Sequence, residues 1–371
     1  MKNSIVQQKN RPIISELVIL RFVACLAVVM IHAIETSLEN YTGELSTIET
    51  LFYHTIRMAM MFGTPTFVFL SELLLAKSYQ GDLPANFLST RAKYLLLPYL
   101  SMAVVYGVIF HANESLNAVF IAVLKNIFLA DFTVYFVLII FQFYLLHFFL
   151  HSYLKTWNRN IVLITSLIIN LLYLAFFNFV PPISFIPNVD FLWYHLSWLP
   201  FPGWLFYFTL GYYCGRHYHE FKMILSKFQK LVFFIPIPVF LLVLILSYTQ
   251  IIGVVSSKRI DIIFYTTTMI FLLIYLSSSV KHLHPIIVKI SNYSFGIYLL
   301  HKIFMYYLKP MPILNSYGFT LYVFITSIIL SMIVIYFVNK LSFGKYIVGR
   351  INTISISNVN GEKTRKKSEI S

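Results

Sequence analysis

Charged residues are scarce in this sequence, and acidic residues are half as frequent as basic ones. Asp, Glu, Lys and Arg make up 11% of the 371 residues, with 14 acidic and 28 basic side chains. Soluble domains contain roughly 25% charged residues. A chain that is 58% hydrophobic, with a mean hydropathy of +0.76, is therefore a polytopic membrane protein.

Cysteine is also rare, and several common motifs are missing. Cys25 and Cys214 both lie in apolar segments, where free thiols behave as small hydrophobic groups. There is no C-x-x-C spacing, so we expect no metal site. There is no phosphate-binding loop, and no loop long enough for a separate hydrolase or ATPase domain. We find no internal repeat, which weighs against an inverted-repeat transporter.

What the sequence does contain is a series of apolar segments of membrane-spanning length. They cover residues 14–34, 54–76, 94–112, 133–153, 160–180, 200–216, 229–249, 261–279, 293–309 and 318–340. A weaker amphipathic segment, 116–130, is expected at the membrane interface. The predicted fold is thus an all-α bundle of about ten transmembrane helices.

The basic residues predict the orientation of this bundle. Most of the 28 Lys and Arg residues fall in the termini and in alternate loops, which the positive-inside rule places in the cytoplasm together with both termini. A net charge of +14 then reflects topology, and no nucleic-acid partner is expected. The predicted divisions are a cytoplasmic N-terminal segment (1–13), a transmembrane domain (14–345) and a basic, disordered cytoplasmic tail (346–371). The protein would reside in the cell membrane.

The first apolar segment, ELVILRFVACLAVVMIHAIE, carries two polar side chains, Arg21 and His32. Ionisable residues within a membrane helix are costly and often functional. Eleven residues are close to three helical turns, so both side chains point the same way, about 16 Å apart along the helix axis. A guanidinium suits phosphate and an imidazole suits general-base catalysis, although snorkelling and helix capping would explain the same residues. Glu35 lies one turn beyond His32, either to orient the imidazole or as a solvated loop acid.

The second and third segments add further polar residues near the predicted cytoplasmic side. Gly63 and Pro65 interrupt the second segment, and Ser71 and Glu72 follow them; Glu72 lies at the depth of Arg21 and could pair with it. Arg91 and Lys93 lie just before the third segment. The two basic residues suit either a polyanionic ligand or anchoring against anionic lipid.

An aromatic stretch near the middle of the chain, FLWYHLSWLPFPGW (191–204), falls on the predicted outer side. It contains three of the four tryptophans, Trp193, Trp198 and Trp204. Flat aromatic faces could stack on sugar rings, and an aromatic belt at the membrane interface would have the same composition. These tryptophans are therefore the candidate residues for binding a sugar acceptor.

Taken in order, four motifs resemble the integral-membrane acyltransferase type 3 family. They are the arginine and histidine separated by ten residues, FGTPTFVFLSELLL, STRAKYLLLPY and SNYSFGIYLLH. The resemblance covers roughly residues 12–345. Within that family, FGTPTFVFLSELL and TRAKYLLLPY resemble the members proposed to O-succinylate poly-N-acetylglucosamine, the intercellular-adhesin polysaccharide.

The resemblance implies an enzyme, and it implies residue roles. His32 matches the family's essential histidine, Arg21 its paired arginine, and Arg91 a basic position near the donor's phosphates. Tyr298 and His301 match by position, with a structural hydrogen bond as the alternative role. Two departures concern the donor site, since many members have Gly where this chain has Glu72, and a second arginine near Tyr94 is absent.

The predicted function is a membrane O-acyltransferase, moving an acetyl or succinyl group from cytoplasmic acyl-CoA to a hydroxyl of a cell-surface or exported polysaccharide. Catalytic candidates are His32, Arg21 and Glu35, and donor-binding candidates are Arg91, Lys93, Ser71 and Glu72. No bound cofactor is expected, and acyl-CoA is the co-substrate. Other expected partners are the glycan acceptor, the lipid bilayer and subunits of a glycan synthase or export complex. The alternatives are a polysaccharide exporter or flippase without acyl-transfer chemistry, and a scaffold subunit.

Overall fold

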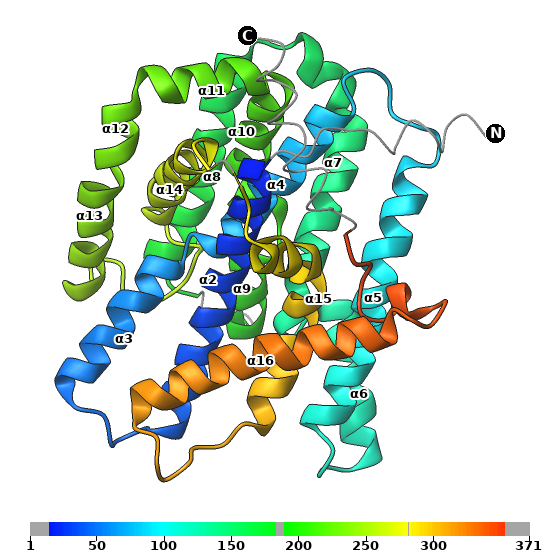
Figure 1. The fold of residues 1–371 in the computed structure, drawn as a ribbon, viewed down its shortest axis with the longest axis vertical. Coiled ribbons are helices and arrows are strands. Elements are labelled where there is room, and N and C mark those ends of the chain that lie inside the picture. The colour runs from blue at the N-terminus through cyan, green and yellow to red at the C-terminus, as the bar shows by residue number, and fades with distance from the viewer. Residues whose placement is uncertain (1–14, 183–188, 281, 353–371) are drawn as a thin grey trace.

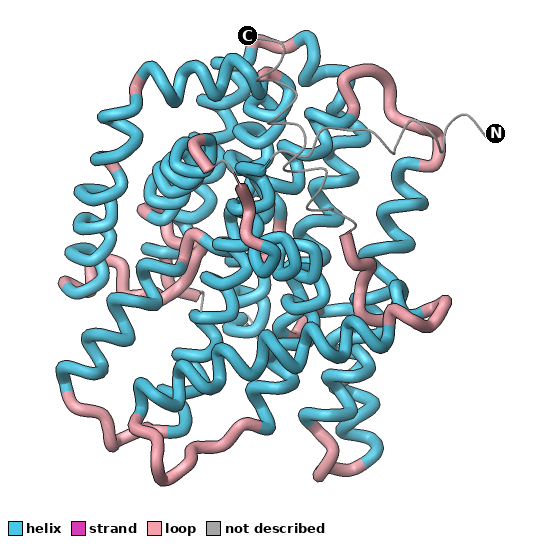
Figure 2. Tube along the Cα trace, viewed as in Figure 1, coloured by secondary structure: helices cyan, strands magenta, loops and turns pink. Residues whose placement is uncertain are grey.

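The fold was analysed in a computed structural model, which describes residues 15–182, 189–280 and 282–352. Within these ranges the chain forms helices and no strand, as predicted for an all-α protein (Figure 2). The first half contains α2 (Ser15–Asn40), α3 (Thr47–Met60), α4 (Gly63–Ser78), α5 (Phe87–Phe110), α6 (Leu116–Leu129), η2 (Thr133–Tyr135), α7 (Phe136–Thr156) and α8 (Arg159–Phe179). The second half contains α9 (Val189–Trp198), η3 (Phe201–Trp204), α10 (Leu205–Arg216), α11 (Tyr218–Lys227), α12 (Gln229–Phe234), α13 (Pro236–Tyr248), α14 (Ile262–Ser278), α15 (Pro285–Tyr307), α16 (Ser316–Val338) and η4 (Gly344–Tyr346).

Helix α2 lies in the middle of the bundle (Figure 1). It packs against α3, α4, α14, α15 and α16, and Leu20, Ala24 and Ala33 on it are completely buried. A helix that is apolar over most of its circumference is expected in the interior, because it has little polar surface to present to solvent. The helix that carries Arg21 and His32 is therefore the one around which the others are arranged.

Helices α4 and α10 approach each other closely because of two glycines. A Cβ atom at Gly211 would overlap the carbonyl oxygen of Phe69, and one at Gly215 would overlap that of Leu73. Glycines four residues apart form the small-x-x-x-small pattern that lets two membrane helices pack backbone to backbone. This contact holds α4, which carries Ser71 and Glu72, against the rest of the bundle.

Within the described ranges, seven helical stretches are long and apolar enough to cross a membrane. They are Ser15–Asn40, Thr47–Ser78, Phe87–Phe110, Leu116–Thr156, Arg159–Phe179, Gln229–Tyr248 and Ser316–Val338. A multi-pass membrane protein is thus supported, whereas about ten crossings with both termini in the cytoplasm stays a prediction. The exterior agrees with a lipid environment: on α8 the exposed residues Ile161, Ile164, Ile168, Leu172 and Phe176 recur every three or four positions. This is the spacing of one helix face.

Two segments differ in detail from the sequence-based expectation. The apolar segment 54–76 is two helices, because α3 ends at Met60 and α4 begins at Gly63. The absence of a side chain at Gly63 allows α4 to cross α2 beside Ala24 and Ala27. At the other end, residues 346–352 of the predicted tail pack onto the bundle, and residues 353–371 lie outside the described residues.

Candidate functional site

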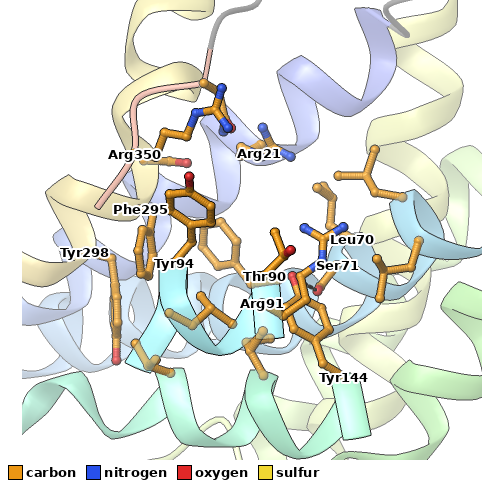
Figure 3. Close-up of a pocket in the computed structure, with 18 of the residues that line it drawn as sticks. Arg21, Leu70, Ser71, Thr90, Arg91, Tyr94, Tyr144, Phe295, Tyr298 and Arg350 are labelled. Carbon is orange, nitrogen blue, oxygen red and sulfur yellow. Dashed lines mark hydrogen bonds between the residues drawn. The ribbon is translucent and has the colours of Figure 1, made fainter. Parts of the chain in front are cut away.

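A cavity of about 900 Å³ opens between α2, α4, α5, α7, α15 and the segment that follows η4. Arg21 and Arg91 line it, as does Ser71. None of the described residues that line the cavity is acidic. Figure 3 shows the guanidinium groups of both arginines directed into the same space. The cavity thus brings together Arg21, a catalytic candidate from the sequence, and the donor-binding candidates Ser71 and Arg91.

Arg91 is held by neighbouring aromatic rings. Its guanidinium lies 5.3 Å from the ring centroid of Tyr144 and 5.5 Å from that of Phe87, and Nη2 donates to the Tyr79 hydroxyl at 3.4 Å. Ser71 donates to the Tyr144 hydroxyl at 3.2 Å. Cation–π contacts position the guanidinium, and no carboxylate among the described residues pairs with it. The N–H groups that do not bond Tyr79 therefore remain available to an anionic ligand.

Two of the predicted donor residues lie away from the cavity. The ammonium group of Lys93 sits 5.0 Å from the ring centroid of Tyr346. Glu72 does not pair with Arg21 as expected: its Oε1 is 2.6 Å from Nδ1 of His147, and both side chains are buried. Glu72 cannot face the cavity together with Ser71, because adjacent residues of a helix point about 100° apart. Ser71 faces the cavity, and Glu72 faces His147 on α7.

The other end of α2 carries a cluster of charged groups around Glu35. Its carboxylate lies 2.7 Å from Nδ1 of His32, 3.2 Å from Nη2 of Arg57 and 3.8 Å from Nζ of Lys302. These contacts join α2, α3 and α15. A carboxylate can only accept, so Nδ1 of a neutral His32 carries the proton and Nε2 keeps its lone pair. Glu35 is therefore in the position expected of a group that orients the imidazole.

A second imidazole lies beside His32. The ring centroids of His32 and His301 are 5.2 Å apart, and Nδ1 of His301 donates to the carbonyl of Ile297 at 2.9 Å. Nε2 of His301 is buried and has no hydrogen-bond partner among the described residues. Tyr298 forms structural hydrogen bonds, because its hydroxyl donates to the Thr133 carbonyl at 2.7 Å and accepts from the backbone N–H at the start of α7.

The cavity reaches the neighbourhood of the two histidines. Val28 and Tyr298 both line it. Val28 is one helical turn before His32 on α2, and Tyr298 is one turn before His301 on α15. The arginine-lined cavity therefore ends about one helical turn before each histidine, and neither histidine lines it.

The predicted tryptophan platform is mostly internal. Trp198 and Trp204 are 2% and 1% exposed, and Nε1 of Trp204 donates to the carbonyl of Trp198. Trp193 contacts the rings of Phe176 and Phe177. In this conformation Trp198 and Trp204 offer no free face to a sugar, because interior packing covers both rings.

One basic residue packs against this aromatic region. Lys258 lies 5.4 Å from the Trp198 ring centroid and 5.6 Å from that of Tyr135. Burial lowers the pKa of Lys258 to about 8, and the negative charge of Glu35 partly offsets this effect. Tyr135 directly precedes Phe136, whose backbone N–H donates to the Tyr298 hydroxyl, so this aromatic region borders α15 one turn before His301.

Sequence reasoning missed Arg57, Lys302 and Arg350. The first two interrupt predicted apolar segments, and a charge within such a segment is itself a signal of a functional or paired position. Lys302 also follows His301 directly. Arg350 had no such signal, because it lies in a basic stretch that reads as a tail.

Comparisons with known proteins show what this chain is similar to. The sequence pattern of a family described as an acyltransferase domain matches residues 14–340. A Bacillus subtilis protein named as the membrane-bound acyltransferase YfiQ is 37% identical, over 91% of this chain and 95% of its own. Proteins of Staphylococcus aureus and Staphylococcus epidermidis named as poly-beta-1,6-N-acetyl-D-glucosamine export proteins are 29% identical, over 78% of this chain and 82% and 81% of theirs. No solved structure matches the chain significantly.

Proposed function

Because this chain belongs to the integral-membrane acyltransferase type 3 family, we propose that it transfers an acyl group from acyl-CoA to a hydroxyl of a cell-surface or exported polysaccharide. One observation carries the proposal: a positively charged cavity of about 900 Å³ extends to within one helical turn of His32 and His301. The arginines suit the phosphates of a CoA donor. An imidazole suits general-base catalysis at the thioester of the acyl donor.

The donor would enter at the arginine end. With the orientation predicted from the basic residues, Arg21 and Arg91 face the cytoplasm, where acyl-CoA is made. Arg21 and His32 are eleven residues apart, about 16 Å along α2 at 1.5 Å per residue. Val28, between them, lines the cavity. This supports direct transfer, with the pantetheine arm lying along α2 and the thioester next to the imidazole.

His32 would act as the general base. Its Nε2 takes the proton of the acceptor hydroxyl while that oxygen attacks the thioester carbonyl carbon. The carbon–sulfur bond then breaks, and the CoA thiolate recovers the proton from the imidazolium. The products are the glycan ester and CoA. Glu35 keeps the imidazole in the required tautomer and stabilises its positive charge; Arg57 and Lys302 hold Glu35 in place.

The acceptor would approach from the His32 end. The side chains of His32 and Glu35 are 23% and 28% exposed, so a polymer could reach them without entering the cavity. The names of the staphylococcal relatives support an N-acetylglucosamine polymer as the acceptor. The transferred group would be acetyl or succinyl.

The same names also favour a second function, polysaccharide export without acyl transfer. The deciding experiment uses purified full-length protein, labelled acetyl- or succinyl-CoA and a poly-N-acetylglucosamine oligomer. Ester formation that falls by about 10²- to 10⁴-fold in His32→Ala, the usual contribution of a general base, would support the enzyme. Absence of ester with either donor, together with polymer retained inside cells that lack the protein, would support export.

A further inference from the structure

The cavity receives a third arginine from the C-terminal end of the described chain. Arg350 lines the cavity together with Arg21 and Arg91. Figure 3 shows its guanidinium facing that of Arg21 above the ring of Tyr94, with Arg91 across the cavity beside Ser71. Three guanidinium groups from α2, α5 and the segment after η4 therefore surround one space.

The segment that carries Arg350 is fixed to the bundle. Val348 is 2% exposed and belongs to the core. The side-chain amide of Asn339 donates to the carbonyl of Gly349 at 3.1 Å. The backbone N–H of Asn352 donates to the carbonyl of Asn292 at 3.1 Å. Gly349 has φ +82°, a left-handed conformation that favours glycine. This turn, held on both sides, directs the next residue into the cavity.

Among the described residues, the positive charge in the cavity has no counter-ion. None of the described lining residues is acidic. No hydrogen bond or ion pair occupies the guanidinium of Arg21 or Arg350 in the described part of the chain, and Arg350 lies 5.8 Å from the ring centroid of Tyr94. Three like charges facing one cavity repel one another. A ligand with several negative charges removes that repulsion, and guanidinium groups bind phosphate oxygens in pairs.

We propose that Arg350 is a donor-binding residue, and that the segment 344–352 completes a site for a ligand with several phosphate groups. The inference rests on the proposed function, in which that ligand is CoA. The phosphates, rather than the acyl group, would contact Arg350, because Arg350 and the histidine pair lie at opposite ends of the arrangement along α2. Arg350 also provides a third basic group where the third segment lacks an arginine near Tyr94.

The test measures binding of CoA, dephospho-CoA and pantethine to the purified full-length protein by calorimetry. Arg350→Ala is compared with Arg350→Lys, which keeps the charge but not the planar fork. The matched control is Lys340→Ala: Lys340 lies over the rings of Tyr336 and Phe337 and does not line the cavity. Gel filtration and thermal unfolding establish that each variant is folded.

We expect Arg350→Ala to raise the Kd for CoA about ten- to a hundredfold, the usual effect of losing hydrogen bonds to a charged group. Arg350→Lys should recover part of the loss, Lys340→Ala should match the wild type, and pantethine binding should not change. An unchanged CoA Kd in Arg350→Ala, or an equal loss for pantethine, would overturn the role of Arg350.

A titration with inorganic pyrophosphate separates this inference from the proposed function. If wild-type protein binds pyrophosphate and Arg350→Ala loses that binding, the anion site is supported even where CoA does not bind. The choice of acyl-CoA as donor would then be wrong. If CoA binds through Arg350 but no ester forms, the site stands and the acyl-transfer reaction is refuted.

Discussion

The contact between His32 and Glu35 yields a quantitative prediction. Replacing Glu35 by Gln keeps the size of the side chain and removes its charge. In the wild type the carboxylate lies 3.2 Å from Arg57 and 3.8 Å from Lys302. The amide of the variant would face the same two cations without neutralising their charge. It also loses the strong interaction with Nδ1 of His32, 2.7 Å away. The imidazole should therefore be less well oriented and its protonated form less stabilised.

The size of the effect follows from the strength of that hydrogen bond. A hydrogen bond to a charged group contributes about 1.5–3 kcal/mol, and about 1.4 kcal/mol of barrier height changes a rate tenfold. Glu35→Gln should thus lower kcat about 10- to 100-fold. Because Glu35 is 28% exposed, solvent screening places the expected value toward the lower end. His32→Ala should lower kcat further, since it removes the base itself.

The assay is ester formation at saturating donor, with the donor Kd measured separately. The donor Kd should be unchanged in Glu35→Gln, because Glu35 does not line the cavity. Glu39→Gln is the matched control: Glu39 is the next acidic residue on α2, one turn further along, and it is exposed. It should retain wild-type kcat.

Two results would contradict the reasoning. A wild-type kcat in Glu35→Gln, with His32→Ala inactive, would mean that Glu35 does not orient the base. A loss of donor binding that parallels the loss of kcat would mean that the substitution disturbs the fold of α2 rather than the catalytic step.

Two further predictions concern the packing that supports the site. Glu72→Leu should lower the free energy of unfolding by about 3–5 kcal/mol, because it leaves His147 without its buried partner; the double variant with His147→Leu should regain most of the loss. Thermal unfolding in detergent checks this, and no recovery in the double variant would contradict it. Gly211→Ala should lower the free energy of unfolding by about 1–3 kcal/mol, because the added Cβ would overlap the carbonyl oxygen of Phe69. Gly81→Ala, with nothing within 4 Å of the added Cβ, should unfold like the wild type, and equal Tm values for the two would refute close packing of α4 on α10.

Local sequence patterns predicted the elements well because helix formation depends on neighbouring residues. Long apolar runs with few charges indicated helices, and most of the described residues in each of those runs are helical. Arg21 and His32 could be identified as candidates because they lie within an apolar segment, where an ionisable side chain needs a partner or a function. Glu35 could be placed within reach of His32 because residues three apart in a helix are neighbours.

Contacts between helices could not be predicted in this way. Adjacent residues on α4 face different helices, so the partner of Glu72 depended on how α4 is rotated against α7. The burial of Trp198 and Trp204 depended on which helices cover the aromatic stretch, since an aromatic-rich segment suits an interface and a core equally well.

The sequence by itself determined that this is a helical membrane protein, that α2 carries a basic and an imidazole side chain on one face, and that its motifs are those of an acyltransferase family. These properties follow from composition and from spacing along one chain. The tertiary structure decided that Arg91 and Arg350 join Arg21 around one cavity, and that Arg57 and Lys302 hold Glu35 beside His32. Residues far apart in the sequence meet only when helices pack, and packing depends on the shape and charge of the whole set of helices at once.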